Sequence, residues 1–427
     1  MSNFPYYMLC IWTFIHVGRP QDIFTFLVPF HIGDVTAAVT ILSYYFTAQH
    51  RPQIRSYPEV RLFIVFVSLG ALSAPFGFYP RESVEDFLFG FGIKLGIYLW
   101  LAAKLVTSEK HVQGVLKSLA FSGVAMAVSA MLRAGMGDRI GGGATYDPND
   151  LALILITTLP IAIVQGLSTP SLRWKVVWFS AAAFNLLGII ATQSRGGFLG
   201  LTTLGIFMLF TKLPGISKKK LILILAALGT IFAIYLGTEY KERIQTILEE
   251  TTSDMTAGSG RIAVWKRAIH IAREHPILGV GPSAFATAYG HYLETDRFPE
   301  DLSAESLGGA WKTAHNSLLL VLTEMGLPGL IIFISINVLS FRNFNKIKAR
   351  STNHVMLKTL SLQATGLQMA LVGFLITAFF LSQAYNILIY LLCFLSGAMT
   401  RISEKAHGDR ILRPIKGIPE VQLGLRH

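Results

Sequence analysis

The sequence predicts an all-α, polytopic membrane protein with about twelve transmembrane helices. Hydrophobic residues make up 52% of the 427 residues and charged residues only 15%, whereas soluble domains carry about 25% charged residues. Apolar runs recur along the whole chain and approach the roughly 20 residues that a helix needs to cross a bilayer. We therefore expect residues 1–427 to form a single membrane domain.

Twelve runs are long enough to be considered as spans. They cover roughly residues 4–18, 33–48, 61–79, 87–107, 111–133, 149–167, 172–193, 196–212, 219–238, 315–338, 360–382 and 384–401. The first run follows no cationic segment, so it is expected to be a retained span and not a cleaved signal peptide. The last two runs almost touch, which predicts a tight hairpin at residues 382–384. The two cysteines, Cys10 and Cys393, suggest no disulfide framework.

The distribution of basic residues predicts the orientation, because short cytoplasmic connections are enriched in Lys and Arg. One set of connections holds Arg51, Arg55, Arg61, Lys104, Lys110, Lys117, Arg173, Lys175, Lys212, Lys218, Lys219, Lys220, Arg342, Lys346, Lys348 and Arg350. The opposite set is richer in acid, as in residues 81–86. This places both termini and the basic tail 402–427 in the cytoplasm. The net charge of +12 is then a topology signal, and we expect no nucleic-acid binding.

The segment 239–314 falls between the ninth and tenth expected spans, on the outer side. It is too long for a simple connector. Residues 261–275 have the periodicity of a short amphipathic helix, with Trp265 as a candidate interfacial anchor and Lys266, Arg267 and Arg273 on its polar face. We expect a periplasmic cap that contains helices.

His315 is the first candidate for chemistry. It stands where a polar loop enters an apolar helix, with Lys312 before it and Asn316 after it. A helix N-terminus attracts anions. The same dipole and Lys312 favour a neutral imidazole, which is the form that a general base needs. The alternative is a histidine that only makes structural hydrogen bonds.

Arg195 stands at a second such position, in Ser194-Arg195-Gly196-Gly197. Ser194 is a candidate N-cap, and the glycines allow backbone N–H groups to approach a ligand. An arginine beside free amides suits phosphate oxygens. The alternative is an arginine that extends toward lipid head groups. Arg261, by itself an ordinary loop cation, would lie on the same side.

A third helix start follows the loop at residues 141–150. Asp147 and Pro148 predict a turn and a helix cap, while Tyr146 and Asn149 are candidates to touch a sugar or phosphate. Acidic pairs in the outer loops have no spacing diagnostic of a metal site, so no metal or other cofactor is expected.

Lys94 and Glu324 fall inside expected spans and are functional candidates on that ground. Glu324 lies near Gly326 and Pro328 and could instead stabilise a helix irregularity.

Four motifs together resemble the bacterial O-antigen ligase and polymerase family. They are Ser194-Arg195-Gly196-Gly197, Gly260-Arg261 with Trp265, Pro276 with residues 279–282, and His315-Asn316-Ser317 with residues 324–326. The large outer loop before the last three spans is similar to the family's architecture, which resembles the GT-C class of membrane glycosyltransferases.

The resemblance implies a transferase of the bacterial inner membrane that works without metal. Its donor would be a glycan on undecaprenyl diphosphate, and its active site would be periplasmic. Arg195 and Arg261 would hold the diphosphate, while His315 would deprotonate the acceptor hydroxyl for inverting attack. Candidate substrate contacts are Ser194, Gly196, Lys312, Asn316, Tyr146 and Asn149.

Several alternatives stay open. The acceptor is lipid A core in a ligase, a further repeat unit in a polymerase, or a protein hydroxyl in an O-oligosaccharyltransferase. A flippase for lipid-linked sugars would be expected to show inverted repeats and midplane polar sites, and no repeat is evident. A non-catalytic scaffold for envelope assembly is the third class.

Overall fold

The structure is a computed structural model that describes residues 3–47, 57–134, 147–227, 229–230, 257–303, 312–351 and 357–411. The described residues form helices joined by turns, with no strand among them. Up to residue 134 the elements are α1 (Phe4–Gly18), α2 (Pro20–Ile23), η1 (Thr25–Phe30), α3 (Ile32–Thr47), α4 (Pro58–Ser73), η2 (Ala74–Phe76), α5 (Pro80–Glu82), η3 (Ser83–Ile93), α6 (Lys94–Leu105) and α7 (Glu109–Ala134). From residue 148 on they are α8 (Pro148–Ser168), α9 (Leu172–Ala191), α10 (Arg195–Phe210), α12 (Ala257–Glu274), α13 (Phe285–Glu294), η5 (Glu300–Leu302), α15 (Ser317–Ser351), α16 (Lys358–Ala378) and α17 (Ile387–Ile411).

Eight helices in the described part of the chain are long and apolar enough to cross a membrane. They are Pro58–Phe76, Pro80–Leu105, Glu109–Leu132, Pro148–Ser168, Leu172–Ala191, Ser317–Arg350, Lys358–Ala378 and Ile387–Ala406. Each coincides with an expected span, so the polytopic helical architecture is confirmed. Helices α1 and α3 and the apolar helix Gly196–Phe210 also form where expected but are shorter. The expected span 219–238 is described only at residues 219–227 and 229–230, and the total of twelve stays a prediction.

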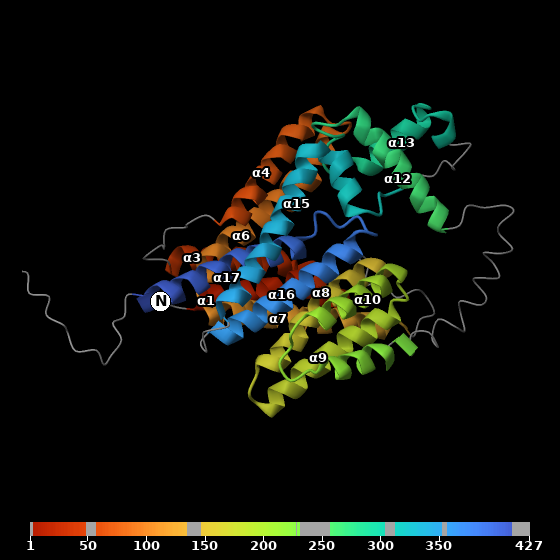
Figure 1. Ribbon diagram of the computed structural model, residues 1–427. Helices are drawn as coiled ribbons and strands as arrows, with labels where there is room; N and C mark the ends of the chain where they lie inside the picture. Colours follow the sequence, from red (N-terminus) through yellow and green to blue (C-terminus); the bar gives the residue numbers. More distant parts are fainter. Residues whose placement is uncertain are drawn as a thin grey trace, which may run out of the picture.

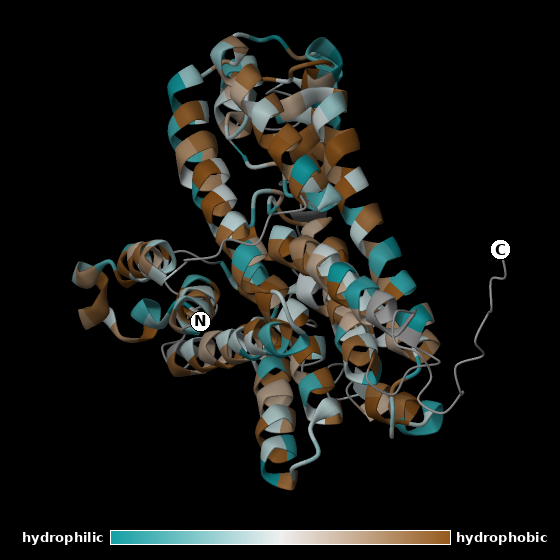
Figure 2. Ribbon diagram, turned by 90° about the vertical axis from the view of Figure 1, so that its left-hand side faces the viewer, coloured by the Kyte–Doolittle hydropathy of each residue, from teal (hydrophilic) through white to brown (hydrophobic). Residues whose placement is uncertain are grey.

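Helix α8 is the centre of the bundle, since 83% of its most apolar 18-residue stretch is buried. It packs against α7, α9, α10 and α16 (Figure 1). The lipid-facing sides of several other helices carry exposed apolar residues, among them Leu72, Val176 and Ile331, and Figure 2 shows hydrophobic residues distributed along these helices. Such exposure is expected where the surrounding solvent is hydrocarbon.

Helices α12 and α13 form a cap near one end of α4 and α15 (Figure 1). The amphipathic helix expected over 261–275 is confirmed by α12. Its apolar side, including Val264, Ala268 and Ile271, is buried, and the helix packs against α15. Trp265 contacts Ala314 and Phe379, so its side chain anchors α12 within the protein.

The prediction that Arg267 lies on the polar face of α12 is wrong. The side chain of Arg267 is only 1% exposed. It donates to the carbonyl oxygens of Leu302 (2.7 Å) and Ser303 (2.6 Å) and to the hydroxyl of Tyr289 (2.6 Å). Arg267 therefore joins α12, α13 and η5 from the inside of the cap.

Helix α15 is broken at Gly326, where the backbone is not helical (φ 66°, ψ −171°). The N–H of Leu327 bonds to the carbonyl oxygen of Pro276 at 2.8 Å. The expected span 315–338 is thus two helical pieces, 317–325 beside the cap and 327–351 in the bundle. The break at Gly326 gives the piece 317–325, which follows His315, a different direction from the piece 327–351.

Candidate active site

Three helix N-termini meet at one place on the bundle, beside the turn between α16 and α17 (residues 379–386, hereafter the α16–α17 turn). They belong to α8, α10 and α15. The first N–H groups of a helix have no intrahelical partner and carry partial positive charge. Those N–H groups that side-chain caps do not use are suited to an anion.

The starts of α8 and α10 are joined by their caps. The carboxylate of Asp147 accepts the N–H groups of Asn149 (2.7 Å) and Asp150 (2.8 Å). The hydroxyl of Ser194 accepts the N–H of Gly197 at 2.9 Å and donates to Oδ1 of Asn149 at 2.7 Å. Both expected caps are confirmed, and the hydroxyl of Ser194 also connects the two helices.

The α16–α17 turn holds α8 and α15 to the same point. Nε2 of Gln383 donates to Oδ1 of Asp150 at 2.7 Å. The backbone N–H of Gln383 donates to the hydroxyl of Ser317 at 2.9 Å, and the backbone N–H of His315 donates to the hydroxyl of Ser382, also at 2.9 Å. The backbone that carries His315 is therefore fixed by contacts from the far end of the chain.

His315 has a left-handed backbone (φ 45°) and a half-buried side chain, with Nε2 at 3.2 Å from the hydroxyl of Thr313. Burial lowers the pKa of His315, and the positive charges of Arg261 and Lys312 lower it further, while Asp147 acts in the opposite direction. The imidazole is thus held in its neutral form at neutral pH. A neutral imidazole can accept a proton from a hydroxyl.

Arg261 reaches this site from the first turns of α12. One turn further on, Nε1 of Trp265 donates to the carbonyl oxygen of Ala314 at 3.1 Å, and the indole packs at 5.6 Å between ring centroids against Phe379. Helix α12 is therefore fastened both to the residue before His315 and to the α16–α17 turn. Lys312 is exposed at the edge of the site.

Asn316 and the glycines at the start of α10 have distinct positions. Oδ1 of Asn316 accepts the N–H groups of Leu318 (2.9 Å) and Leu319 (3.0 Å), so this buried residue caps α15. A side chain at Gly197 would lie 2.7 Å from Cβ of Ala152 in α8, whereas Gly196 has ordinary van der Waals space around it. The close helix contact therefore requires Gly197, and the surroundings of Gly196 leave room near the helix start.

Two expected site residues are not placed in full. The backbone of Arg195 begins α10 at the site, but its side chain is outside the described part of the structure, and Tyr146 lies outside the described residues. The remaining seven residues belong to one neighbourhood: His315, Arg261, Lys312, Asn316, Asn149, Ser194 and Gly196. The sequence did not identify Ser382 and Gln383 as residues of the site, because it predicted only a tight hairpin at residues 382–384.

Glu324 connects the cap to the α16–α17 turn. Its buried carboxylate accepts the N–H groups of Ser283 and Phe285, both at 3.0 Å, and the hydroxyl of Tyr385 at 2.6 Å. Glu324 lies two residues before the break at Gly326. This position agrees with the alternative in which Glu324 stabilises a helix irregularity. Lys94 instead lines a separate cavity of about 250 Å³.

Comparison with known proteins gives one family. Residues 180–334 match the family model described as O-antigen ligase. The matched segment contains Ser194, Arg195, Arg261 and His315, and the expected family is confirmed on it. No curated protein matches the chain.

Proposed function

Residues 180–334 carry an O-antigen ligase domain, and from this premise we propose that the protein is an inverting glycosyltransferase. It moves a glycan from undecaprenyl diphosphate to an acceptor hydroxyl. The observation that carries the proposal is the meeting of His315 and Arg261 at three helix N-termini, where the charge of Arg261 acts on the pKa of the imidazole. A base beside cationic side chains and helix N-termini is what transfer from a diphosphate requires.

In the proposed reaction, the neutral imidazole of His315 takes the proton of the acceptor hydroxyl. The acceptor oxygen forms a bond to the anomeric carbon from the side opposite the diphosphate. The bond between that carbon and the diphosphate oxygen breaks, and its electron pair leaves with the diphosphate. Arg261 and Arg195, with Lys312 at the edge, stabilise the negative charge that develops there.

The positions of the helix starts support a cooperative role for the backbone. Gly196 lies at the first turn of α10, and its N–H belongs to the group without an intrahelical partner. Ser194 and Asn149 hold the starts of α8 and α10 together. We propose that the backbone N–H of Gly196 and the side chain of Asn149 contact phosphate or sugar oxygens of the donor.

The basic connections support an orientation with this site on the periplasmic face. The described helices carry Arg61, Lys346, Arg401 and Lys405 around the opposite end of the bundle. Under the positive-inside rule, that end is cytoplasmic. We propose that both termini are cytoplasmic, that segment 239–314 is a periplasmic cap, and that the protein resides in the bacterial inner membrane.

The acceptor is not distinguished by any described contact. Lipid A core, a further repeat unit and a protein hydroxyl all present a hydroxyl to the same base. Of these we propose lipid A core, as in a ligase. A flippase or a scaffold would make no use of a base at the site, so loss of transfer on removing His315 separates them from an enzyme.

The test uses membrane vesicles that contain the protein, a labelled polyprenyl-diphosphate glycan and each acceptor in turn. His315→Ala and Arg261→Gln are each expected to lower the transfer rate by at least about 10²-fold, as for the loss of a general base or of a charge stabiliser. His31→Ala is the matched control, because His31 also has a left-handed backbone (φ 44°) before a helix and is exposed. Transfer at the wild-type rate in His315→Ala would contradict the proposal.

A further inference from the structure

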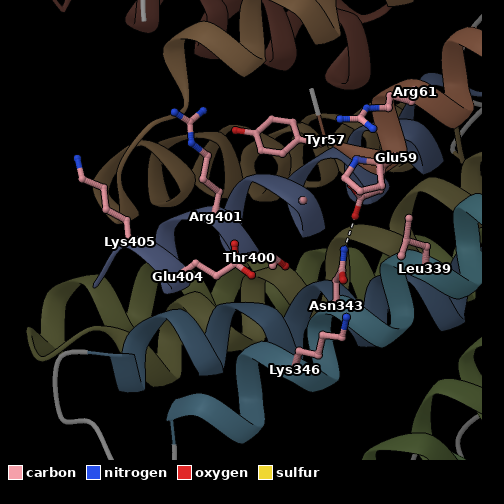
Figure 3. Close-up of a pocket in the computed structure, with 12 residues that line it drawn as sticks. Tyr57, Glu59, Arg61, Leu339, Asn343, Lys346, Thr400, Arg401, Glu404 and Lys405 are labelled. Carbon is pink, nitrogen blue, oxygen red and sulfur yellow. Dashed lines mark hydrogen bonds between the residues drawn. The ribbon is translucent and has the colours of Figure 1, made fainter. Parts of the chain in front are cut away.

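A cavity of about 670 Å³ lies at the other end of the bundle, between α4, α15 and α17 (Figure 3). Lys405 lines it and follows Ile387, the first residue after the α16–α17 turn, by about five turns of α17. At about 1.5 Å per residue this separation is about 27 Å along the helix, close to the roughly 30 Å thickness of the hydrocarbon core. The cavity therefore lies at the membrane face opposite the His315 site.

Four basic side chains line this cavity. They are Arg61, Lys346, Arg401 and Lys405. The one exposed acid in the lining, Glu404, is paired with Arg350 at 3.3 Å. Among the described residues, no ion pair joins Lys346, Arg401 or Lys405 to an acid. Concentrated positive charge beside a cavity of this size favours a phosphate group.

A buried carboxylate stands in the same cavity. Glu59 is only 2% exposed. Its Oε1 accepts from Nδ2 of Asn343 (Figure 3) and from the hydroxyl of Ser396 at 3.1 Å. Its Oε2 has no hydrogen-bond partner within the described structure and faces Gly397, where a Cβ atom would lie 2.6 Å away. A buried polar atom without a partner is costly, so a ligand with a donor group is favoured here.

We propose that this cavity binds the head group of a phospholipid that carries a primary amine beside its phosphate. The basic side chains hold the phosphate, and the ammonium donates to Oε2 of Glu59. A free phosphate would bring a second negative charge close to that carboxylate oxygen, whereas an ammonium brings the opposite charge. The proposal does not depend on glycosyl transfer, which occurs at the opposite end of the molecule.

The surroundings of the cavity suit a lipid more than a soluble ligand. The exposed apolar residues Ile331, Ile334 and Val338 form a stripe at helical spacing on α15. The stripe ends next to Leu339, which lines the cavity. Acyl chains lying along this stripe would bring the head group to the basic side chains.

The experiment measures lipid retention by native mass spectrometry. The whole protein is reconstituted in nanodiscs with equal parts of phosphatidylethanolamine, phosphatidylglycerol and phosphatidylcholine, then released into detergent. Wild type is expected to retain phosphatidylethanolamine at least about tenfold better than the other two, since tenfold is about 1.4 kcal/mol and a hydrogen bond to a charged group contributes at least that much.

Two variants separate the roles of the charges. Lys346→Gln with Lys405→Gln is expected to lower retention about thirtyfold, because a juxtamembrane cation contributes about 1 kcal/mol near phosphate. Both lysines are exposed, so folding is not at risk. Glu59→Gln is expected to remove the preference for ethanolamine over glycerol. The control is Arg173→Gln with Lys175→Gln at the start of α9, which removes the same charge away from the cavity.

Equal loss of retention in the Arg173 and Lys175 control would show that only net charge matters and would overturn the site. Equal retention of phosphatidylglycerol and phosphatidylethanolamine by wild type would overturn the role of Glu59 as an amine acceptor. Displacement of the lipid by inorganic phosphate or glycerol phosphate at similar concentrations would reassign the cavity to a soluble ligand.

Discussion

The left-handed backbone of His315 allows its chemistry to be separated from its contribution to stability. With φ at 45°, any residue with a Cβ atom pays about 1–2 kcal/mol that glycine avoids. Glycine loses about 0.5–1 kcal/mol more backbone entropy than alanine on folding. His315→Gly is therefore expected to be more stable than His315→Ala by about 0.5–1 kcal/mol.

Both variants lack the imidazole, so both are expected to lose transfer activity by about 10² to 10⁴-fold. Stability is measured by reversible unfolding in mixed SDS micelles, and transfer is measured with labelled donor in vesicles. His31, with φ at 44° and an exposed side chain, is the matched position. There the change from alanine to glycine should give the same gain in stability with no change in rate.

Three results would refute this reasoning. If His315→Gly transfers glycan near the wild-type rate, the imidazole is not the base. If the glycine variant gains stability over the alanine variant at His31 but not at His315, the backbone strain at the site is compensated by other contacts. If the glycine variant is both more stable and more active than the alanine variant, activity follows folding and the two effects are not separate.

Further predictions concern the charges and the caps around the base. The rate of transfer is expected to fall on acidification with a midpoint below the ordinary pKa of about 6.5 for histidine, because burial and Arg261 lower the pKa of His315. Arg261→Gln should move this midpoint to higher pH, and Asp147→Asn, which keeps a capping residue, should move it to lower pH; shifts in the opposite directions would contradict the arrangement. Ser194→Ala is expected to cost about 2 kcal/mol, from one cap and one hydrogen bond, and to lower the rate up to about 10²-fold through misplacement of α10. Thr203→Ala on the same helix, which loses only a bond to its own turn, should leave both stability and rate within error.

The features that could be predicted from the sequence are those set by neighbouring residues. A span depends on about 20 consecutive side chains, and eight expected spans appear as helices of the required length. A helix cap depends on residues within one turn, and Asp147 and Ser194 cap α8 and α10 as expected. The family was likewise recognised from short motifs, and residues 180–334 match it.

The features that could not be predicted depend on residues far apart in the chain. Arg267 was expected on the polar face of α12, because helical periodicity assigns a charged residue to water. The carbonyl groups that bury it belong to Leu302 and Ser303, which no local pattern connects to α12. The same holds for Ser382, whose hydroxyl fixes the backbone of His315 from another helix hairpin.

Glu324 shows how this limitation affects a functional argument. A carboxylate within an apolar run is by default a candidate for substrate or proton movement. Hydropathy treats residues 317–350 as one span, whereas the break at Gly326 leaves the acid beside the cap. There its three donors come from Ser283, Phe285 and Tyr385, and Tyr385 belongs to the turn that also fixes His315. Because the carboxylate joins the cap that carries Arg261 to that turn, we expect any effect of Glu324 variants on transfer to act through the relative positions of His315 and Arg261.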